Sequence, residues 1–223
     1  MVGVVEIGGG VEWSRINDGE HVPTLDAGCP RRCVPCGACR FARGTRRHLL
    51  SGCQPQGGAT RRQREMSIAA KICGLSTAAA VATAVAEGAA FVGFIFYPPS
   101  PRAISAEKAA ELCAGTPRTV ARVGTFVDAD DDAIASVLEA APIDILQFHG
   151  NESPARVADA QARFARPVMK AVSIAGAEDV AASIQYEDVA DMLLFDAKPP
   201  RRPDALPGGN GLAFDWGLIA GRS

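Results

Sequence analysis

The 223-residue chain lacks the features that would place it in a membrane, secreted or nucleic-acid-binding class. No apolar run reaches the ~18 residues that a membrane-spanning helix needs. The N-terminus lacks a basic start followed by an apolar core, so the sequence predicts no secretory signal. The net charge of −2 gives no overall attraction to nucleic acid or to a membrane surface. We therefore expect a cytoplasmic protein with neither nucleic acid nor membrane among its partners.

Lysine is absent before residue 66, and carboxylates are absent between Arg31 and Arg64, where nine arginines lie. Ten arginines and six acidic residues give residues 1–65 a net charge of +4. Since the whole chain has a net charge of −2, residues 66–223 carry −6. Residues 1–65 also lack the apolar periodicity of helices and strands, apart from a short strand expected at 2–7. We place a domain boundary at about residue 66. We expect residues 1–66 to be a disordered extension, or else sequence that is not translated because the true start is Met66. We expect residues 67–223 to form a folded domain.

Five of the seven cysteines crowd this extension, at Cys29, Cys33, Cys36, Cys39 and Cys53. Closely spaced thiolates can hold zinc or an iron–sulfur cluster. Sites of that kind normally draw further ligands from a distant turn, and His48 and Cys53 are the only candidates here. Because the cysteines are odd in number and clustered in one segment, they do not form a disulfide framework spread over the fold. This pattern indicates a protein of a reducing compartment. We expect no metal and no cofactor.

After Met66, short apolar runs alternate with helical patterns. The strand-like runs lie at 68–74, 90–96, 119–126, 143–148, 167–172 and 191–195. The helical patterns lie at 77–87, 105–113, 129–140, 153–163 and 177–184, and a last helix opens at 214–216. The second run is apolar throughout, which is typical of a strand buried on both faces of a parallel sheet.

Strands that alternate with helices predict parallel βα units, arranged as a doubly wound sheet or as a (β/α)8 barrel. In both architectures the reactive groups lie at the carboxyl ends of the strands. Polar residues fall at these ends, whereas the middles of the strands are apolar. They are Lys71, Cys73, Arg102, Asp128, Gln147, His149, Asp196 and Lys198. Strands with apolar middles and polar carboxyl ends are typical of an enzyme, so this pattern predicts one.

The run at 68–74 places Lys71 and Cys73 on one face, because alternate side chains of a strand point to the same side. Cys73 lies at the carboxyl lip, where Gly74 lets the chain turn sharply. A thiolate base and a carboxylic acid such as Asp196, facing each other from two strand ends, can take a proton from carbon and give one to oxygen without a cofactor. Such a pair suits aldose–ketose chemistry.

Six short segments occur in one order along residues 67–223. They are Lys71-Ile72-Cys73-Gly74, Gly93-Phe94-Ile95-Phe96, Ser100-Pro101-Arg102, Leu146-Gln147-Phe148-His149-Gly150, Phe195-Asp196-Ala197-Lys198, and Gly208-Gly209-Asn210-Gly211 with Phe214-Asp215-Trp216. In these segments the chain resembles the phosphoribosylanthranilate isomerase family of tryptophan biosynthesis. One four-residue match is a weak signal, whereas six in register are specific. The resemblance implies a (β/α)8 barrel and leaves residues 1–66 without a counterpart.

The family carries out an Amadori rearrangement of a phosphosugar, N-(5'-phosphoribosyl)anthranilate, to 1-(2-carboxyphenylamino)-1-deoxyribulose 5-phosphate. The resemblance implies that Cys73 is the general base that takes the C2 proton and that Asp196 is the general acid that protonates the furanose ring oxygen. It also implies that Arg102 lies near the anthranilate carboxylate. The remaining implied substrate-binding residues are Lys71, Gln147, His149 and three glycines of a closing loop, Gly208, Gly209 and Gly211.

The family continues for two βα units beyond the position of Ser223, and these carry its main phosphate site. We therefore expect an incomplete barrel of about six units with low activity on its own. Its first and last parallel strands are expected to have bare edges, which favour self-association.

Other interpretations stay open. A barrel fragment that only binds a partner is the alternative to the isomerase. A metal-dependent epimerase needs histidine ligands, and only His149 follows Met66. Indole-glycerol-phosphate synthase needs more lysines and glutamates at the strand ends than this chain has. Lys71 has a second interpretation, as a structural ion-pair partner of Asp196.

Overall fold

The computed structural model describes residues 2–3, 5–7, 69–200 and 205–220. All of these belong to one compact unit, Met1–Glu20 with Ile68–Ser223, and a second unit comprises His21–Ser67. The boundary expected near residue 66, the cysteine cluster and most of the extension expected to be disordered therefore lie outside the described residues. None of the described helices is long and apolar enough to cross a membrane.

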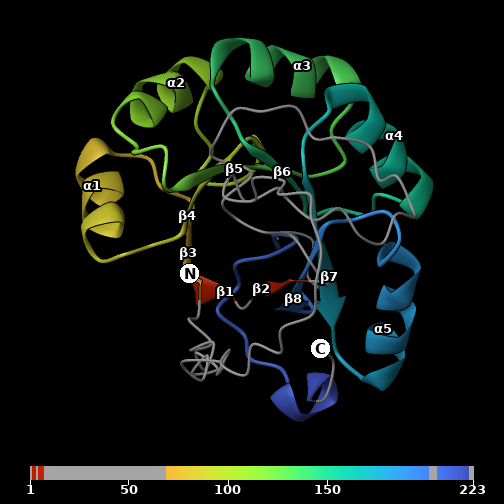
Figure 1. Ribbon diagram of the computed structural model, residues 1–223. Coiled ribbons are helices and arrows are strands. Elements are labelled where there is room, and N and C mark those ends of the chain that lie inside the picture. Colours follow the sequence, from red (N-terminus) through yellow and green to blue (C-terminus); the bar gives the residue numbers. More distant parts are fainter. Residues whose placement is uncertain (1, 4, 8–68, 201–204, 221–223) are drawn as a thin grey trace, which may run out of the picture. The chain divides into compact units, whose positions relative to one another are not determined.

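Parallel strands form the centre of the fold (Figure 1). They are β3 (Lys71–Cys73), β4 (Phe91–Ile95), β5 (Ala121–Phe126), β6 (Ile145–Phe148), β7 (Val168–Ile174) and β8 (Met192–Ala197). Each strand pairs with the next one in chain order. A doubly wound sheet reverses its strand order at a switch point, whereas this order runs in one direction. The strands therefore form a half-barrel of the (β/α)8 type, which confirms the fold that the resemblance implied.

Helices follow the strands and lie on their outer side (Figure 1). They are α1 (Ala78–Ala86), α2 (Ala106–Ala114), α3 (Asp131–Ala140), α4 (Pro154–Phe164) and α5 (Ala177–Ala182), with short 3-10 helices η2 (Ser183–Tyr186) and η3 (Trp216–Ile219). Four of them begin at a side-chain cap that accepts a backbone N–H from three residues further on: Thr77, Ser105, Asp130 and Ser153. Caps of this kind satisfy N–H groups that the first helical turn leaves free.

Two short N-terminal strands cover the outer edges of this sheet. β1 (Val2–Gly3) pairs antiparallel with β3, and β2 (Val5–Ile7) pairs antiparallel with β8. The strand expected at 2–7 is confirmed, in two pieces. The expectation of bare edges on the first and last parallel strands is wrong, because the start of the same chain pairs with both. This removes the reason for expecting self-association through those edges.

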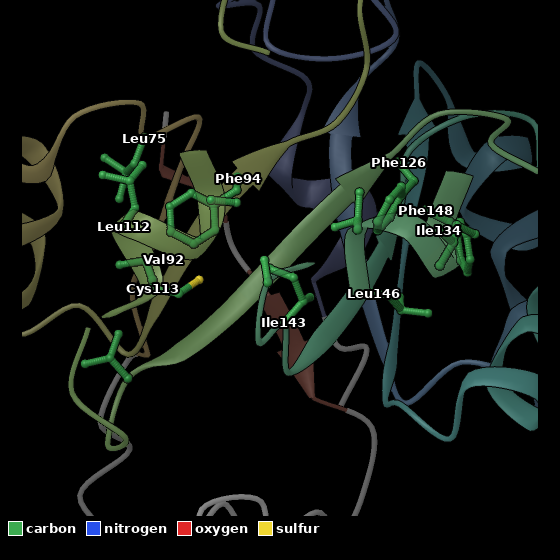
Figure 2. Packing of buried hydrophobic residues seen from close by; sticks show 14 of the residues in the cluster. Leu75, Val92, Phe94, Leu112, Cys113, Phe126, Ile134, Ile143, Leu146 and Phe148 are labelled. Carbon is green, nitrogen blue, oxygen red and sulfur yellow. The ribbon is translucent and has the colours of Figure 1, made fainter. Parts of the chain in front are cut away.

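The strands separate two of the hydrophobic clusters of the described residues. One lies between strands and helices and includes Val92, Phe94, Phe126, Phe148, Leu112 and Ile134 (Figure 2). The other lies on the opposite face and includes Phe91, Val123, Ile145, Met169 and Leu194. Because side chains alternate along a strand, the residue two positions closer to the carboxyl end continues the same face. Thr125, Gln147 and Asp196 therefore lie directly beyond this second cluster, at the carboxyl ends of their strands.

Candidate active site

A cavity of about 280 Å³ lies at the carboxyl ends of the parallel strands. Every site residue predicted from the sequence lines it, namely Lys71, Cys73, Arg102, Gln147, His149, Asp196, Gly208, Gly209 and Gly211. The alternation of side chains explains this convergence for Lys71, Cys73, Gln147 and Asp196, since each strand presents its last inward residues to the same space. The roles of these residues stay predictions.

Cys73 is the last residue of β3, and its thiol lies 3.7 Å from the hydroxyl of Thr125 on β5. Strand β4 lies between them and places Gly93 opposite Cys73 in the ladder. A Cβ on Gly93 would lie only 2.9 Å from the Cys73 Sγ and 3.1 Å from the Lys71 Nζ. The missing side chain at Gly93 thus leaves the space in which Lys71 and Cys73 meet.

The surroundings of Cys73 favour its thiolate. Burial alone would raise the pKa of the thiol, because burial disfavours a charge. The ammonium of Lys71, the hydroxyl of Thr125 and the guanidinium of Arg102 outweigh that effect and hold the pKa of Cys73 below its ordinary value. Cys113 in α2 shows the opposite outcome, since burial raises its pKa to about 11. Only Cys73 of these two is suited to act as a base.

Asp196 on β8 faces His149, the residue that follows β6. The Oδ2 of Asp196 lies 3.3 Å from the Nε2 of the His149 imidazole. The Nδ1 of the same ring lies 2.9 Å from the amide nitrogen of Gln147. With the amide assigned in this orientation, its nitrogen donates to Nδ1, and the neutral imidazole carries its proton on Nε2, toward Asp196. Burial acts to raise the pKa of Asp196, but His149 and the N–H groups of Ala197 and Gly209 hold it below its ordinary value.

Three buried polar atoms at this point have no hydrogen-bond partner among the residues that the structure describes: Gln147 Oε1, His149 Nε2 and Asp196 Oδ2. The last two lie within ion-pair distance of each other but lack hydrogen-bond geometry. A buried unsatisfied polar atom costs about 1–3 kcal/mol, so native proteins keep such atoms for a reason. Their location in the cavity suits them to bind polar groups of a ligand.

The loop that follows β8 covers this His–Asp pair. A Cβ on Gly208 would collide with the imidazole of His149 and would lie 2.7 Å from Asp196 Oδ2. The backbone can rest this close only because Gly208 has no side chain. Gly209 contributes its N–H to the carboxyl of Asp196. The loop therefore presents backbone groups to the same space as the predicted acid.

Two polar residues at the strand ends do not line the cavity. Lys198 is half exposed and pairs with Asp179 at 3.1 Å. Asp128 accepts a hydrogen bond from the backbone N–H of Asn151, at 2.7 Å. The second interpretation of Lys71, as the ion-pair partner of Asp196, is also not met among the described residues, because Asp196 is paired with His149.

Sequence reasoning missed Thr125, which lines the cavity and contacts the Cys73 thiol. The signal was present, because Thr125 is the polar end of the alternating inward face that begins at Ala121 and Val123. Tyr97, which also lines the cavity, belongs to a loop whose course no local pattern predicts, and Trp216 lines it from the start of η3. Among the described residues, no group of three or more His, Cys, Asp or Glu is close enough to hold a metal ion.

Residues 70–223 match the family model described as N-(5'phosphoribosyl)anthranilate (PRA) isomerase. The chain is 56% identical over 158 residues to the N-(5'-phosphoribosyl)anthranilate isomerase of Paracoccus denitrificans (strain Pd 1222), a match that covers 70% of this chain and 73% of that protein. It is 50% identical over 158 residues to the protein of the same name from Rhodospirillum centenum, covering 71% of this chain and 74% of that one.

Solved structures agree with this match. The phosphoribosyl anthranilate isomerase of Thermotoga maritima is 34% identical, with a TM-score of 0.59 over 67% of this chain and 68% of that chain. A phosphoribosyl anthranilate isomerase in complex with reduced 1-(o-carboxyphenylamino)-1-deoxyribulose 5-phosphate is 31% identical, with a TM-score of 0.56 over 67% of this chain and 66% of that chain.

Proposed function

Because the chain belongs to the N-(5'-phosphoribosyl)anthranilate isomerase family, we propose that it catalyses the Amadori rearrangement of N-(5'-phosphoribosyl)anthranilate in tryptophan biosynthesis. One observation carries the proposal. A single cavity holds a thiol whose pKa is lowered by a neighbouring ammonium and a carboxyl that faces an imidazole. This is the acid–base pair that an aldose–ketose isomerase needs.

Asp196 acts first, as the general acid. Its carboxyl gives a proton to the furanose ring oxygen, the bond from that oxygen to C1 breaks, and the nitrogen lone pair forms an iminium at C1. The imidazole of His149, 3.3 Å away, faces this carboxyl and holds it in position.

Cys73 acts next, as the general base. Its thiolate takes the proton from C2, and the electrons of that C–H bond form a C1=C2 double bond while the iminium nitrogen regains its lone pair. The resulting enol amine tautomerises to the ketose product, 1-(2-carboxyphenylamino)-1-deoxyribulose 5-phosphate. No electrons leave the substrate, so the reaction needs no cofactor. The thiol must stay reduced, which supports our placement of the protein in the cytoplasm.

Four other groups of the cavity bind the substrate in this proposal. The Arg102 guanidinium meets the anthranilate carboxylate, for which its planar fork of donors is suited. Lys71 and Gln147 face the ribose hydroxyls. The backbone N–H groups of the loop at 208–211 meet the phosphate.

Purified protein tests the proposal directly. We expect turnover of N-(5'-phosphoribosyl)anthranilate, and loss of at least a thousandfold in kcat for Cys73→Ser and Asp196→Asn. Cys113→Ser is the matched control, because Cys113 is a buried thiol outside the cavity. Binding of substrate without turnover by the unmodified chain would favour the alternative of a binding fragment.

A further inference from the structure

A buried ion pair lies outside the cavity, between strand β7 and the loop that follows β6. Lys170 Nζ is 2.9 Å from Glu152 Oε2, and the two side chains are 3% and 2% exposed. Taking charges out of water costs on the order of several kcal/mol per ion, so such a pair is weak evidence for stability. Neither residue lines the cavity. The pair therefore calls for a role other than stability.

The carboxylate of Glu152 gathers donors from three parts of the chain. The backbone N–H of Asp128, after β5, donates to Oε1 at 2.9 Å. The N–H of Gly150 donates to both carboxylate oxygens, at 3.1 and 3.0 Å. Lys170 donates to Oε2 and also to the carbonyl of Gly150, at 2.7 Å. The ion pair thus holds both backbone groups of Gly150.

Further contacts fix the residues on either side of Gly150. The hydroxyl of Tyr186 donates to the carbonyl of Glu152 at 2.8 Å, and Lys170 Nζ lies 5.6 Å from the centre of the Tyr186 ring. On the other side, the N–H of His149 donates to the carbonyl of Phe126 at 2.8 Å. The loop from 149 to 152 is therefore bound to the end of β5 and, through Lys170, to β7.

His149 is the first residue of this loop, and its ring points into the cavity. Its Nε2 lies 3.3 Å from Asp196 Oδ2 and its Nδ1 lies 2.9 Å from Gln147. A shift of about 1 Å in a reacting group can lower a rate about a hundredfold. Any movement of Gly150 would move the neighbouring imidazole by a similar amount.

We propose that Glu152 and Lys170 are positioning residues, which hold the loop at 149–152 so that the His149 imidazole faces the carboxyl of Asp196. This inference rests on the proposed function for its effect on catalysis. Its structural part, the orientation of the imidazole, does not depend on the reaction. The two parts can therefore be measured separately.

The competing interpretation is that the ion pair only stabilises the fold. Arg122 and Asp144 provide a matched control, because they form a two-pronged ion pair with both N–O distances at 2.7 Å. They join the start of β5 to the segment before β6, at the end of the strands away from the cavity. Neither lines the cavity.

The experiment compares Glu152→Gln and Lys170→Met with Asp144→Asn in the full chain. We expect the first two to lower kcat at least tenfold with KM changed less than threefold, and Asp144→Asn to keep kcat within twofold while lowering the melting temperature. In a His149→Asn background, Glu152→Gln should cause no further loss of kcat, because Glu152 acts through His149. A further tenfold loss in that background would overturn the proposal.

The imidazole itself gives a readout free of activity. The nitrogen and proton NMR chemical shifts of the His149 imidazole should change in the Glu152→Gln variant and should be unchanged in the Asp144→Asn variant. The signals of His21 and His48 serve as internal references. Unchanged shifts in a folded Glu152→Gln protein would overturn the proposal. If that variant does not fold, Tyr186→Phe removes one hydrogen bond of the same network and is held to the same readouts. Absence of turnover in the unmodified protein, with the shifts moved as expected, would refute the proposed function and leave the positioning intact.

Discussion

The thiol of Cys73 and the carboxyl of Asp196 belong to the first and last parallel strands, and both line one cavity. Each group has a partner that acts to lower its pKa. A cation, Lys71, lies beside the thiol, whereas an imidazole, His149, faces the carboxyl. The cavity thus brings together the predicted base and the predicted acid, each beside its own partner. The predictions below test this arrangement.

Lys71→Met should slow the alkylation of Cys73. Lys71 lowers the pKa of the thiol, so its removal raises that pKa, and the reactive thiolate then forms only at higher pH. We expect the rate of reaction of Cys73 with iodoacetamide at pH 7 to fall about tenfold, because less of the thiol is ionised. Mass spectrometry of the Cys73 peptide separates it from the other cysteines.

Lys108→Met is the control for this measurement, because Lys108 forms an exposed ion pair with Glu111 on α2. Its loss should leave the alkylation of Cys73 unchanged. Equal rates in the Lys71 variant and the unmodified protein would show that the ammonium does not act on the thiol.

Gly93→Ala should damage catalysis more than stability. The new Cβ would lie 2.9 Å from the Cys73 Sγ and 3.1 Å from the Lys71 Nζ, so both side chains must shift. We expect kcat/KM to fall about ten- to a hundredfold, as for a small misplacement of a reacting group. Gly115→Ala is the control, because its Cβ would meet only the Leu112 carbonyl, at 3.8 Å. Equal kinetics in the two variants would argue against a Lys71–Cys73 pair over Gly93.

Deletion of residues 1–7 should free the edges of β3 and β8. The five register pairs of β1 and β2 would be lost, and each hydrogen bond contributes about 0.5–1.5 kcal/mol. We expect amide hydrogen exchange to quicken in segments 71–73 and 192–197, and self-association to increase because bare edges pair with one another. Exchange in β5, in the middle of the sheet, serves as the internal reference. Unchanged exchange at both edges would contradict the pairing.

Local patterns were enough to predict the parallel strands and the end at which the site lies. The alternation that sets Lys71 with Cys73, and Gln147 with His149, is a property of each strand by itself, and the carboxyl ends of parallel strands meet in any barrel. The resemblance then selected the barrel over the doubly wound sheet, which alternation could not do.

Contacts between distant parts of the chain could not be predicted in this way. Nothing in 2–7 indicates that it pairs with both β3 and β8, because an edge accepts any strand that reaches it. The ion pair of Glu152 with Lys170 joins a loop to the next strand, and its burial depends on packing that no single segment encodes. The partner of Asp196 proved to be His149 rather than Lys71 for the same reason.

The most direct test of the account is the Cys73→Ala variant, assayed for turnover and for binding of reduced 1-(o-carboxyphenylamino)-1-deoxyribulose 5-phosphate. The account predicts that the Kd for this compound stays within threefold of the unmodified protein while kcat falls at least a thousandfold, because only proton removal from C2 is lost. A Cys73→Ala protein that binds the compound and keeps kcat within tenfold would contradict the assignment of Cys73 as the base.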